Sequence, residues 1–140
     1  MTSDLEKRVH ELPWHHQIDF GNGLLSPGST KISTLKAQAD VYFRHGMEGK
    51  EFLDIGCWDG FNSFEARRRG AARVLATDHF AWSEKCWGKR ESFELARAHL
   101  APEVDVLDID LPELSQERIG RFHVVLFAGV FYHLRHPLLV

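Results

Sequence analysis

Two carboxylates and two glycines lie together in the segment Phe52–Gly60, which reads FLDIGCWDG. Apolar residues lead into Asp54, and Gly56 and Gly60 follow, an order typical of a strand that ends in a tight loop and opens a helix. Glycines in such a loop let the backbone approach a ligand closely. The loop also carries Asp59 and contains no Lys or Arg. Carboxylates would repel a pyrophosphate and attract a cation, for example a sulfonium.

A further carboxylate supports a nucleoside ligand at this loop. Asp78 closes the apolar run that begins at Val74 and lies about 20 residues beyond the glycine loop, where an acid often binds ribose hydroxyls. Taken alone, Asp78 would more simply cap the segment that follows it. Together with a loop that favours a sulfonium, it points to S-adenosylmethionine rather than a dinucleotide or a nucleoside triphosphate.

The elements that must position these residues alternate along the chain from residue 51 onward. Because strands alternate with helices, the pattern predicts an α/β fold with a parallel sheet and helices on its faces. We expect strands at Glu51–Ile55, Arg73–Thr77, Val104–Leu107 and Phe122–Phe127, and helices at Phe61–Arg69 and Glu91–Leu100.

The first 50 residues form a separate N-terminal part, followed by a Rossmann-like domain over residues 51–140. A helix is predicted over Ser3–Leu12, where Ser3 and Glu6 are spaced as a capping pair. Pro13–Thr30 is rich in Gly, Pro and His and predicts an irregular arm. Apolar residues at helical spacing then predict a helix within Lys31–His45.

Composition excludes several classes of protein. The chain has 140 residues, 44% hydrophobic and 26% charged, and a net charge of −3, which suits a globular domain and gives no overall attraction to nucleic acid. No apolar run reaches the roughly 20 residues of a membrane span, and the N-terminus has no apolar signal core. Two cysteines form no spaced framework. We therefore expect a cytoplasmic protein without a membrane partner.

Three segments of the chain resemble class I S-adenosylmethionine-dependent methyltransferases. These segments are DIGCWDGFNSFEARRRGA, ATDHF and VVLFAGVFYHLRHPL. More narrowly, they and the arm motif WHHQIDF resemble the branch of tRNA wobble-uridine 5-oxyacetate/methoxy methyltransferases. The resemblance implies a seven-stranded fold of which this chain holds the four-strand N-terminal part, in the order 3-2-1-4. The chain then looks C-terminally truncated.

The resemblance also implies roles for individual residues. The methionine part of the cofactor would lie against Asp54, Gly56 and Gly60, and the ribose would lie against Asp78. The adenine would contact Asp108 and Ile109, the sulfonium would lie over Gly129, and the transferred methyl would lie near Tyr132 and His133. The chain departs from the family pattern at two positions, Trp58, where a middle glycine is usual, and His123, where the fourth strand commonly begins with Asp.

Methyl transfer to a hydroxyl needs an in-line acceptor and, commonly, a base that removes its proton. His133, after the fourth strand, is the first candidate, and Tyr132 stands beside it. His15 and His16 on the arm are further candidates, since a mobile arm could close over the acceptor. The alternatives are that His133 only bonds a backbone carbonyl and that transfer proceeds by positioning alone.

Other residues have simpler interpretations. His133 and His136 lack a nearby third ligand, so we expect no metal. Cys57 is expected to be a packing residue, and the run Arg67–Arg69 to be a solvated helix end rather than a nucleic-acid patch. Trp82 and Trp87 either cover the sheet edge or form a wall beside the ligand.

The leading functional hypothesis is O-methylation of a small-molecule acceptor. A tRNA-modifying methyltransferase is the second, and a non-catalytic cofactor-binding fragment is the third. We expect ordinary S-adenosylmethionine rather than its carboxylated variant, because Lys31 and Lys36 stand without the pattern that would hold an extra carboxylate. The apolar fourth strand would have an open edge, so we expect self-association or a partner there.

Overall fold

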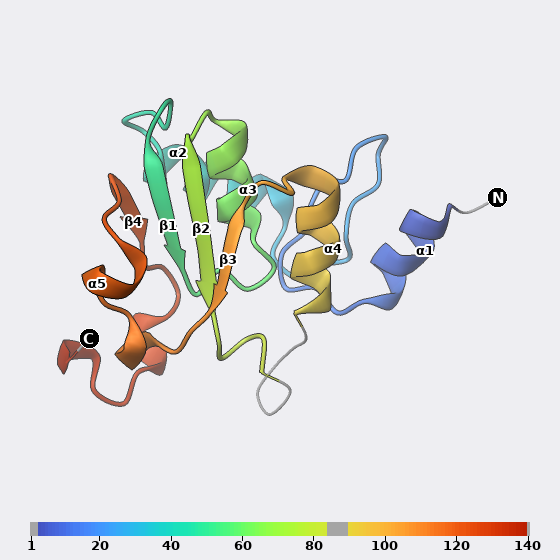
Figure 1. Cartoon of the computed structure of the whole chain (residues 1–140). Helices are drawn as coiled ribbons and strands as arrows, with labels where there is room; N and C mark the ends of the chain where they lie inside the picture. The colour runs from blue at the N-terminus through green and yellow to red at the C-terminus, as the bar shows by residue number, and fades with distance from the viewer. Residues whose placement is uncertain (1–2, 84–89, 140) are drawn as a thin grey trace.

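The computed structural model describes residues 3–83 and 90–139, and its centre is a four-stranded parallel sheet (Figure 1). The strand order is β3-β2-β1-β4, which confirms the predicted order 3-2-1-4. The strands are β1 (Glu51–Ile55), β2 (Arg73–Asp78), β3 (Asp105–Asp108) and β4 (Val124–Leu126). The two central strands, β1 and β2, are mostly buried, as expected of a parallel sheet covered by helices.

The register aligns the ends of the strands that carry the predicted site. Ile55 pairs with Thr77, and Asp78 pairs with Asp108. Since all four strands are parallel, the loops that follow them emerge at one edge of the sheet. The predicted bounds of β1 are the observed ones, and those of the other strands differ by at most two residues.

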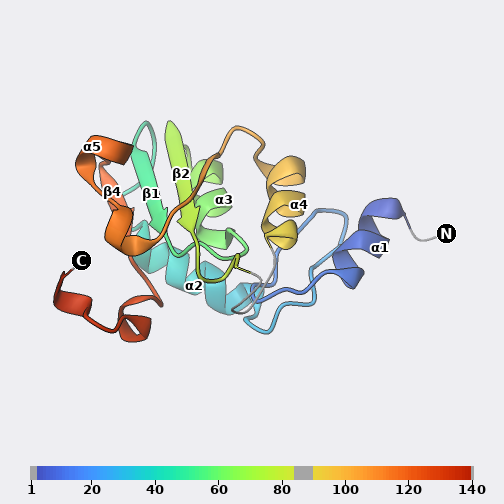
Figure 2. The same ribbon diagram turned by 60° about the horizontal axis from the view of Figure 1, so that its bottom comes forward.

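Helices cover the sheet as predicted, with small shifts at their ends. Helix α3 packs on β1 and β2, and α2 packs on α3; α4 lies beyond α3, and α1 lies farthest out (Figures 1 and 2). The bounds are α1 (Asp4–Glu11), α2 (Ile32–Tyr42), α3 (Phe61–Arg68), α4 (Glu91–Leu100) and α5 (Gln116–Ile119), with short 3₁₀ turns at η1 (Leu111–Glu113), η2 (Phe131–His133) and η3 (Pro137–Leu139).

Local signals in the sequence explain where these helices begin and end. The Ser3 hydroxyl accepts a hydrogen bond from the Glu6 amide at 3.1 Å and so caps α1, as the capping pair predicted. Helix α3 begins after Gly60, whose φ of 90° suits glycine. His123 accepts a hydrogen bond from the Glu51 amide at 3.0 Å through Nδ1, so it joins β4 to β1 in a structural role.

One hydrophobic core joins the N-terminal part to the sheet. Phe52 of β1 and Phe93 of α4 are fully buried, and Phe93 stacks on Phe64 of α3 with ring centroids 5.7 Å apart. Val9 of α1 and Phe20 of the arm belong to the same cluster. The N-terminal segments are thus packed where they can contribute to a site at the sheet edge.

Two residues outside the predicted site, Cys57 and Trp82, are buried. Cys57 is buried, and burial raises the pKa of its thiol well above the usual value, as for an inert packing residue. Trp82 is also buried and contacts Phe93, whereas Trp87 lies outside the described residues. No helix in the described ranges is long and apolar enough to span a bilayer.

Candidate functional site

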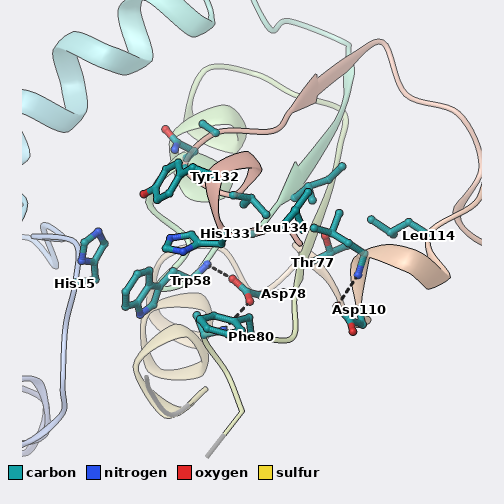
Figure 3. Close-up of a pocket in the computed structure, with 18 of the residues that line it drawn as sticks. His15, Trp58, Thr77, Asp78, Phe80, Asp110, Leu114, Tyr132, His133 and Leu134 are labelled. Carbon is teal, nitrogen blue, oxygen red and sulfur yellow. Dashed lines mark hydrogen bonds between the residues drawn. The ribbon is translucent and has the colours of Figure 1, made fainter. Parts of the chain in front are cut away.

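A cavity of about 820 Å³ lies at the edge of the sheet where the strands end (Figure 3). Its size falls within the roughly 300–1,000 Å³ of small-molecule and cofactor sites. The loops after all four strands contribute to its wall, and so do the N-terminal arm (residues 13–30) and α2. The lining residues include His15, His16, Leu35, Gln38, Tyr42, Gly56, Trp58, Asp78, Phe80, Ile109, Asp110, Gly129, Val130, Tyr132, His133 and Arg135.

Six of the nine residues predicted for the site line this cavity. They are Gly56, Asp78, Ile109, Gly129, Tyr132 and His133. Tyr132 is 76% exposed at the mouth. Figure 3 shows Tyr132, His133 and Trp58 following one another along one side of the cavity, with His15 beside Trp58.

Three predicted residues, Asp54, Gly60 and Asp108, do not line the cavity. Asp54 is buried under the loop, where Oδ2 accepts a hydrogen bond from the Ser63 hydroxyl at 2.7 Å. Asp108 lies outside, 2.8 Å from His79 Nδ1. Asp110, two residues later, lines the cavity in its place, because the chain turns into η1 directly after the strand.

Asp78 ties the end of β2 to the glycine loop. Its Oδ1 accepts hydrogen bonds from the amides of His79 and Ala81, at 2.7 and 3.0 Å, and Oδ2 accepts one from the Trp58 amide at 2.9 Å. Asp78 therefore caps the segment that follows β2, as its simpler interpretation predicted. A carboxylate has about four acceptor positions, so Oδ2 keeps capacity for one further donor on the cavity side.

Positive φ angles at Gly56, Trp58 and Gly60 shape the glycine loop. Gly56 has a φ of 75°, and a Cβ there would overlap the Val130 side chain, so the loops after β1 and β4 touch at this point. Trp58 has a φ of 51°, a conformation that costs a non-glycine residue about 1–2 kcal/mol. Trp58 thus adopts a left-handed conformation, which favours glycine, and adds an indole to the wall.

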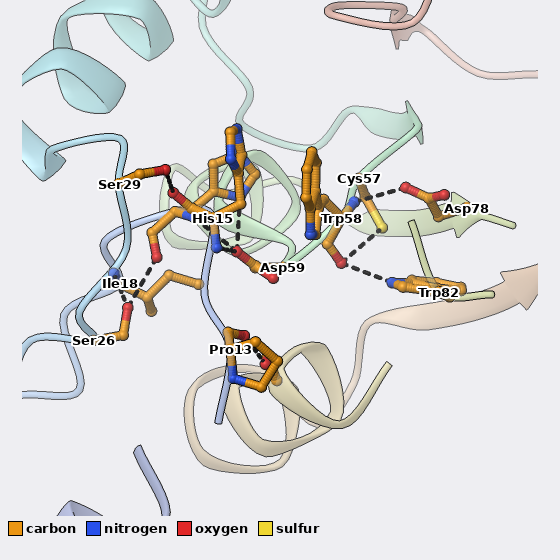
Figure 4. Close-up of polar contacts among 12 residues, drawn as sticks. Pro13, His15, Ile18, Ser26, Ser29, Cys57, Trp58, Asp59, Asp78 and Trp82 are labelled. Atoms are coloured by element: carbon orange, nitrogen blue, oxygen red, sulfur yellow. Dashed lines mark hydrogen bonds and ion pairs between the residues drawn. The ribbon is translucent and has the colours of Figure 1, made fainter. Parts of the chain in front are cut away.

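The N-terminal arm is fastened to this loop and not loosely placed over it (Figure 4). Oδ2 of Asp59 accepts hydrogen bonds from the amides of His15 at 2.6 Å and His16 at 2.7 Å. The imidazole of His15 stacks on the indole of Trp58, with centroids 4.0 Å apart and planes 9° apart. The arm is irregular as predicted, but these contacts make it part of the cavity wall.

Burial shifts the pKa values of the acids in the glycine loop and at the end of β2 upward. Desolvation raises the pKa of Asp54 to about 7 and that of Asp59 to about 6, and it also raises the pKa of Asp78. The charge of Asp78 adds to the shifts of Asp54 and Asp59. A cation in the cavity would relieve this repulsion, whereas a phosphate would increase it.

The two arm histidines are held as neutral groups. Desolvation lowers the pKa of His16 to about 3 and lowers that of His15 as well. His16 Nδ1 lies 3.8 Å from Asp59 Oδ2 and has no hydrogen-bond partner among the described residues. A histidine with so low a pKa is a poor base at neutral pH. His16 is therefore a poor candidate for the base, and the role of His133 stays a prediction.

Sequence reasoning missed the contribution of α2. Leu35, Gln38 and Tyr42 line the cavity and are spaced i, i+3 and i+7, so they share one face of the helix. That spacing was visible in the sequence, but nothing in it indicated which element this face would meet.

Within the described residues, no group of three or more His, Cys, Asp or Glu side chains could hold a metal ion.

The cavity has the features that S-adenosylmethionine would require. Among the described lining residues, Arg135 is the only Lys or Arg, while Asp78 and Asp110 supply carboxylates. Gly56 and Gly129 offer backbone without side chains. Like Gly56, Gly129 has a positive φ, of 74°. A cationic nucleoside therefore fits the charge and the shape of the wall.

Comparison with known proteins agrees with this arrangement, although no protein-family profile matches the chain. The chain is 31% identical over 93 residues to the tRNA U34 carboxymethyltransferase of Geobacter sp. strain M21, and 33% identical over 95 residues to that of Pseudomonas aeruginosa strain LESB58. Each match covers 66% of this chain and 27% of the relative. The chain thus spans about a quarter of the length of these curated relatives.

Solved structures show the same fold over nearly the whole chain. The N-terminal domain of EvdMO1, crystallised in the presence of SAH and D-fucose, superposes with a TM-score of 0.73 and 22% identity, covering 96% of this chain and 55% of that domain. The same domain with SAH bound gives a TM-score of 0.71 and 21% identity, with 96% and 56% coverage. In sequence this chain is thus similar to tRNA U34 carboxymethyltransferases, and in fold it is similar to the N-terminal domain of EvdMO1.

Proposed function

We propose that this chain binds S-adenosylmethionine and transfers its methyl group to a hydroxyl of a small molecule. The observation that carries the proposal is the position of Asp78. It lies at the end of β2 in a cavity that Gly56 and Gly129 also line. In open α/β sheets, nucleoside ligands bind outside the carboxyl ends of the strands at such a point.

The lining residues have distinct roles in this proposal. The ribose hydroxyls donate to Asp78, whose Oδ2 accepts only the Trp58 amide among the contacts described. Ile109, which is buried, packs against the adenine. The glycine backbones at Gly56 and Gly129 allow the methionine part and the sulfonium to approach closely.

The loop after β4 carries the residues that act in methyl transfer at the mouth of the cavity. When bound, the cofactor supplies an electrophilic methyl group on its sulfonium. His133 accepts the proton of the acceptor hydroxyl, and Tyr132 holds the acceptor beside it. His133 is positioned by the η2 turn, in which its amide donates to the Val130 carbonyl at 2.9 Å, and by Phe80, whose ring stacks on it at 6.1 Å.

Three consecutive arginines of the chain are paired with carboxylates, which favours a small acceptor over a polyanion. Arg67, Arg68 and Arg69 are all engaged in ion pairs, at 2.7 Å with Glu103, 2.6 Å with Glu65 and 2.6 Å with Asp40, respectively. Their charges are thus compensated by carboxylates within the fold. The chain as a whole is also negative, at −3.

A uridine of tRNA is the second candidate acceptor. It is favoured by the curated relatives, which are named tRNA U34 carboxymethyltransferases. Binding to tRNA would fall steeply with salt, because each phosphate contact releases counterions. A filter-binding series from low to high NaCl with total tRNA distinguishes the two candidates.

Titration calorimetry with S-adenosylmethionine and S-adenosylhomocysteine tests the proposal directly. We expect heat from both ligands, and weaker binding of both to Asp78→Ala. Transfer of labelled methyl groups to a panel of monosaccharides and phenols, compared with tRNA, then separates the acceptors. The absence of heat with either ligand would refute methyltransferase function for this chain. Binding without transfer to any acceptor would favour the third hypothesis, a non-catalytic cofactor-binding chain.

A further inference from the structure

Four residues, His15, His16, Trp58 and Asp59, join the N-terminal arm to the glycine loop, and we call them the clasp. We propose that Asp59 is a positioning residue, which sets the arm-side wall of the cavity through His15 and Trp58 and thereby controls ligand affinity. The inference rests on the proposed cofactor site, since the wall matters only if the cavity binds a ligand.

The carboxylate of Asp59 is directed to the arm and away from the cavity. Its Oδ2 accepts two backbone amides, those of His15 and His16, which are 44 and 43 residues distant in sequence. Asp59 is 2% exposed and is absent from the cavity wall, whereas both histidines are part of it. Hydrogen bonds to an ionised carboxylate are stronger than neutral ones. Asp59 is therefore a strong attachment point for the arm.

Trp58 completes the clasp on the cavity side. Its indole stacks on His15, its amide donates to Asp78, and its carbonyl accepts the Trp82 indole N–H at 2.8 Å. Asp59 holds the backbone of His15, and this fixes the imidazole against Trp58. The loop residues Trp58 and Asp59 thus contact the arm at two adjacent residues. Trp58 stacks on His15, and Asp59 accepts the amides of His15 and His16.

The arm keeps its shape through contacts that do not involve Asp59. The Ser26 hydroxyl is fully buried; it donates to the His16 carbonyl at 2.9 Å and accepts from the Ile18 amide at 2.8 Å (Figure 4). The Thr30 amide donates to the His15 carbonyl at 2.9 Å, and a Cβ at Gly28 would overlap the His16 backbone. Loss of Asp59 should therefore detach the arm from the loop without unravelling the arm itself.

The clasp predicts a separation between stability and affinity. Asp59 lies outside the cavity, so its removal leaves Asp78, Gly56 and Ile109 in place. The wall formed by His15, His16 and Trp58 would lose its fixed position. We expect at least a tenfold loss of S-adenosylhomocysteine affinity in Asp59→Ala while the protein stays folded.

Two Asp59 variants and one control test the proposal. Asp59→Ala removes charge and acceptor, whereas Asp59→Asn removes only the charge and keeps one oxygen for the two amides. Asp19→Ala is the control, because Asp19 is an exposed carboxylate of the same arm that binds only the Gly21 amide among the contacts described. Calorimetry with S-adenosylhomocysteine gives the affinity, and amide hydrogen exchange at His15 and His16 reports the clasp itself.

We expect affinity and exchange protection to fall together, most in Asp59→Ala, less in Asp59→Asn and not in Asp19→Ala. Fast exchange in Asp59→Ala with unchanged affinity would overturn the proposal. If Asp59→Ala does not fold, Trp58→Gly serves instead, because it removes the stacked wall and keeps the backbone bonds to Asp78 and Trp82.

If the wild-type chain does not bind S-adenosylhomocysteine, the proposed function fails. The effect of Asp59 on the cavity wall is then measured through the surroundings of Trp58 alone. In that case, near-ultraviolet circular dichroism of Asp59→Ala must show a changed tryptophan signal that Asp19→Ala lacks. An unchanged signal would overturn the clasp.

Discussion

Asp78 accepts the backbone N–H of Trp58 at 2.9 Å, so the end of β2 and the loop after β1 are joined through one carboxylate oxygen. The same carboxylate accepts the amides of His79 and Ala81 through its other oxygen. Any ligand that Asp78 binds is therefore bound to a group that also shapes the loop around it.

Replacement of Asp78 by Asn should weaken ligand binding and loosen the loop. Asn has one accepting oxygen where Asp has two, so its NH₂ group would face either Trp58 or the pair of His79 and Ala81. A lost or reversed hydrogen bond of this kind costs about 1–3 kcal/mol. We expect S-adenosylhomocysteine affinity to fall roughly tenfold or more, as measured by calorimetry.

Asp108→Asn is the matched control for this variant. The family resemblance implied that Asp108 contacts the adenine, but it lies outside the cavity beside His79. We expect the S-adenosylhomocysteine affinity of Asp108→Asn to stay within about twofold of wild type. Such a change is smaller than one kcal/mol, which corresponds to roughly fivefold. A larger loss at Asp108 than at Asp78 would contradict the site described here.

Asp54→Asn should stabilise the protein above neutral pH and have little effect in acid. Burial raises the pKa of Asp54 to about 7, so the folded state binds this proton more tightly than the unfolded chain does. Its stabilising contribution is complete below the unfolded pKa near 4 and is lost as the pH rises through about 7. Asn avoids the buried charge and can still accept from Ser63.

Thermal denaturation at pH 5 and pH 8 measures this effect. We expect the melting temperature of Asp54→Asn relative to wild type to rise by a few degrees between the two conditions, about 2–4 °C for each kcal/mol in a chain near this size. Asp19→Asn, at an exposed position, should show no such change. A difference that does not depend on pH would argue against a buried, ionising Asp54.

Gly56→Ala should destabilise the chain through both backbone strain and a clash with Val130. Gly46 separates the two effects, because its φ of 76° is nearly that of Gly56 at 75°, while a Cβ there would meet no atom within 4 Å. Gly46→Ala should therefore cost about 1–2 kcal/mol, the strain alone. Gly56→Ala should cost more, as measured by urea denaturation.

A double variant tests whether the excess comes from the Val130 side chain. Val130→Ala should recover much of the additional loss in Gly56→Ala and none of the loss in Gly46→Ala. Equal destabilisation of the two glycine variants would mean that the loops after β1 and β4 do not meet as described.

The edge at β4 is expected to support self-association. β4 is the outer strand of the described sheet, and its Val125 is 53% exposed. Exposed apolar edge strands pair with other chains, and a lysine there prevents this. We expect sedimentation velocity to show concentration-dependent association of the wild type that Val125→Lys reduces. A wild type that stays monomeric at all concentrations would contradict this expectation.

Much of the fold was predictable because its signals are local. β1 and α4 have the bounds that their apolar patterns predicted, and Ser3 caps α1 as its spacing to Glu6 indicated. The parallel order follows from alternating strands and helices. The side-chain roles at the loop were less predictable, since a carboxylate binds whichever donor the fold brings to it.

Asp59 shows this limit most clearly. In the sequence, Asp54 and Asp59 were equivalent carboxylates of a loop that favours a cation. In the structure, Asp54 is bonded to Ser63 and Asp59 to the arm, and neither lines the cavity. Only Asp78 of the three faces the cavity.

The sequence by itself determined that a glycine loop and a following acid would meet at one edge of a parallel sheet, because strand alternation and spacing are encoded locally. Only the tertiary structure decided that Trp58 would adopt a left-handed backbone and that the arm would fasten to Asp59. Those contacts join residues more than 40 positions apart. Such pairings depend on how whole elements pack, and no local pattern specifies them.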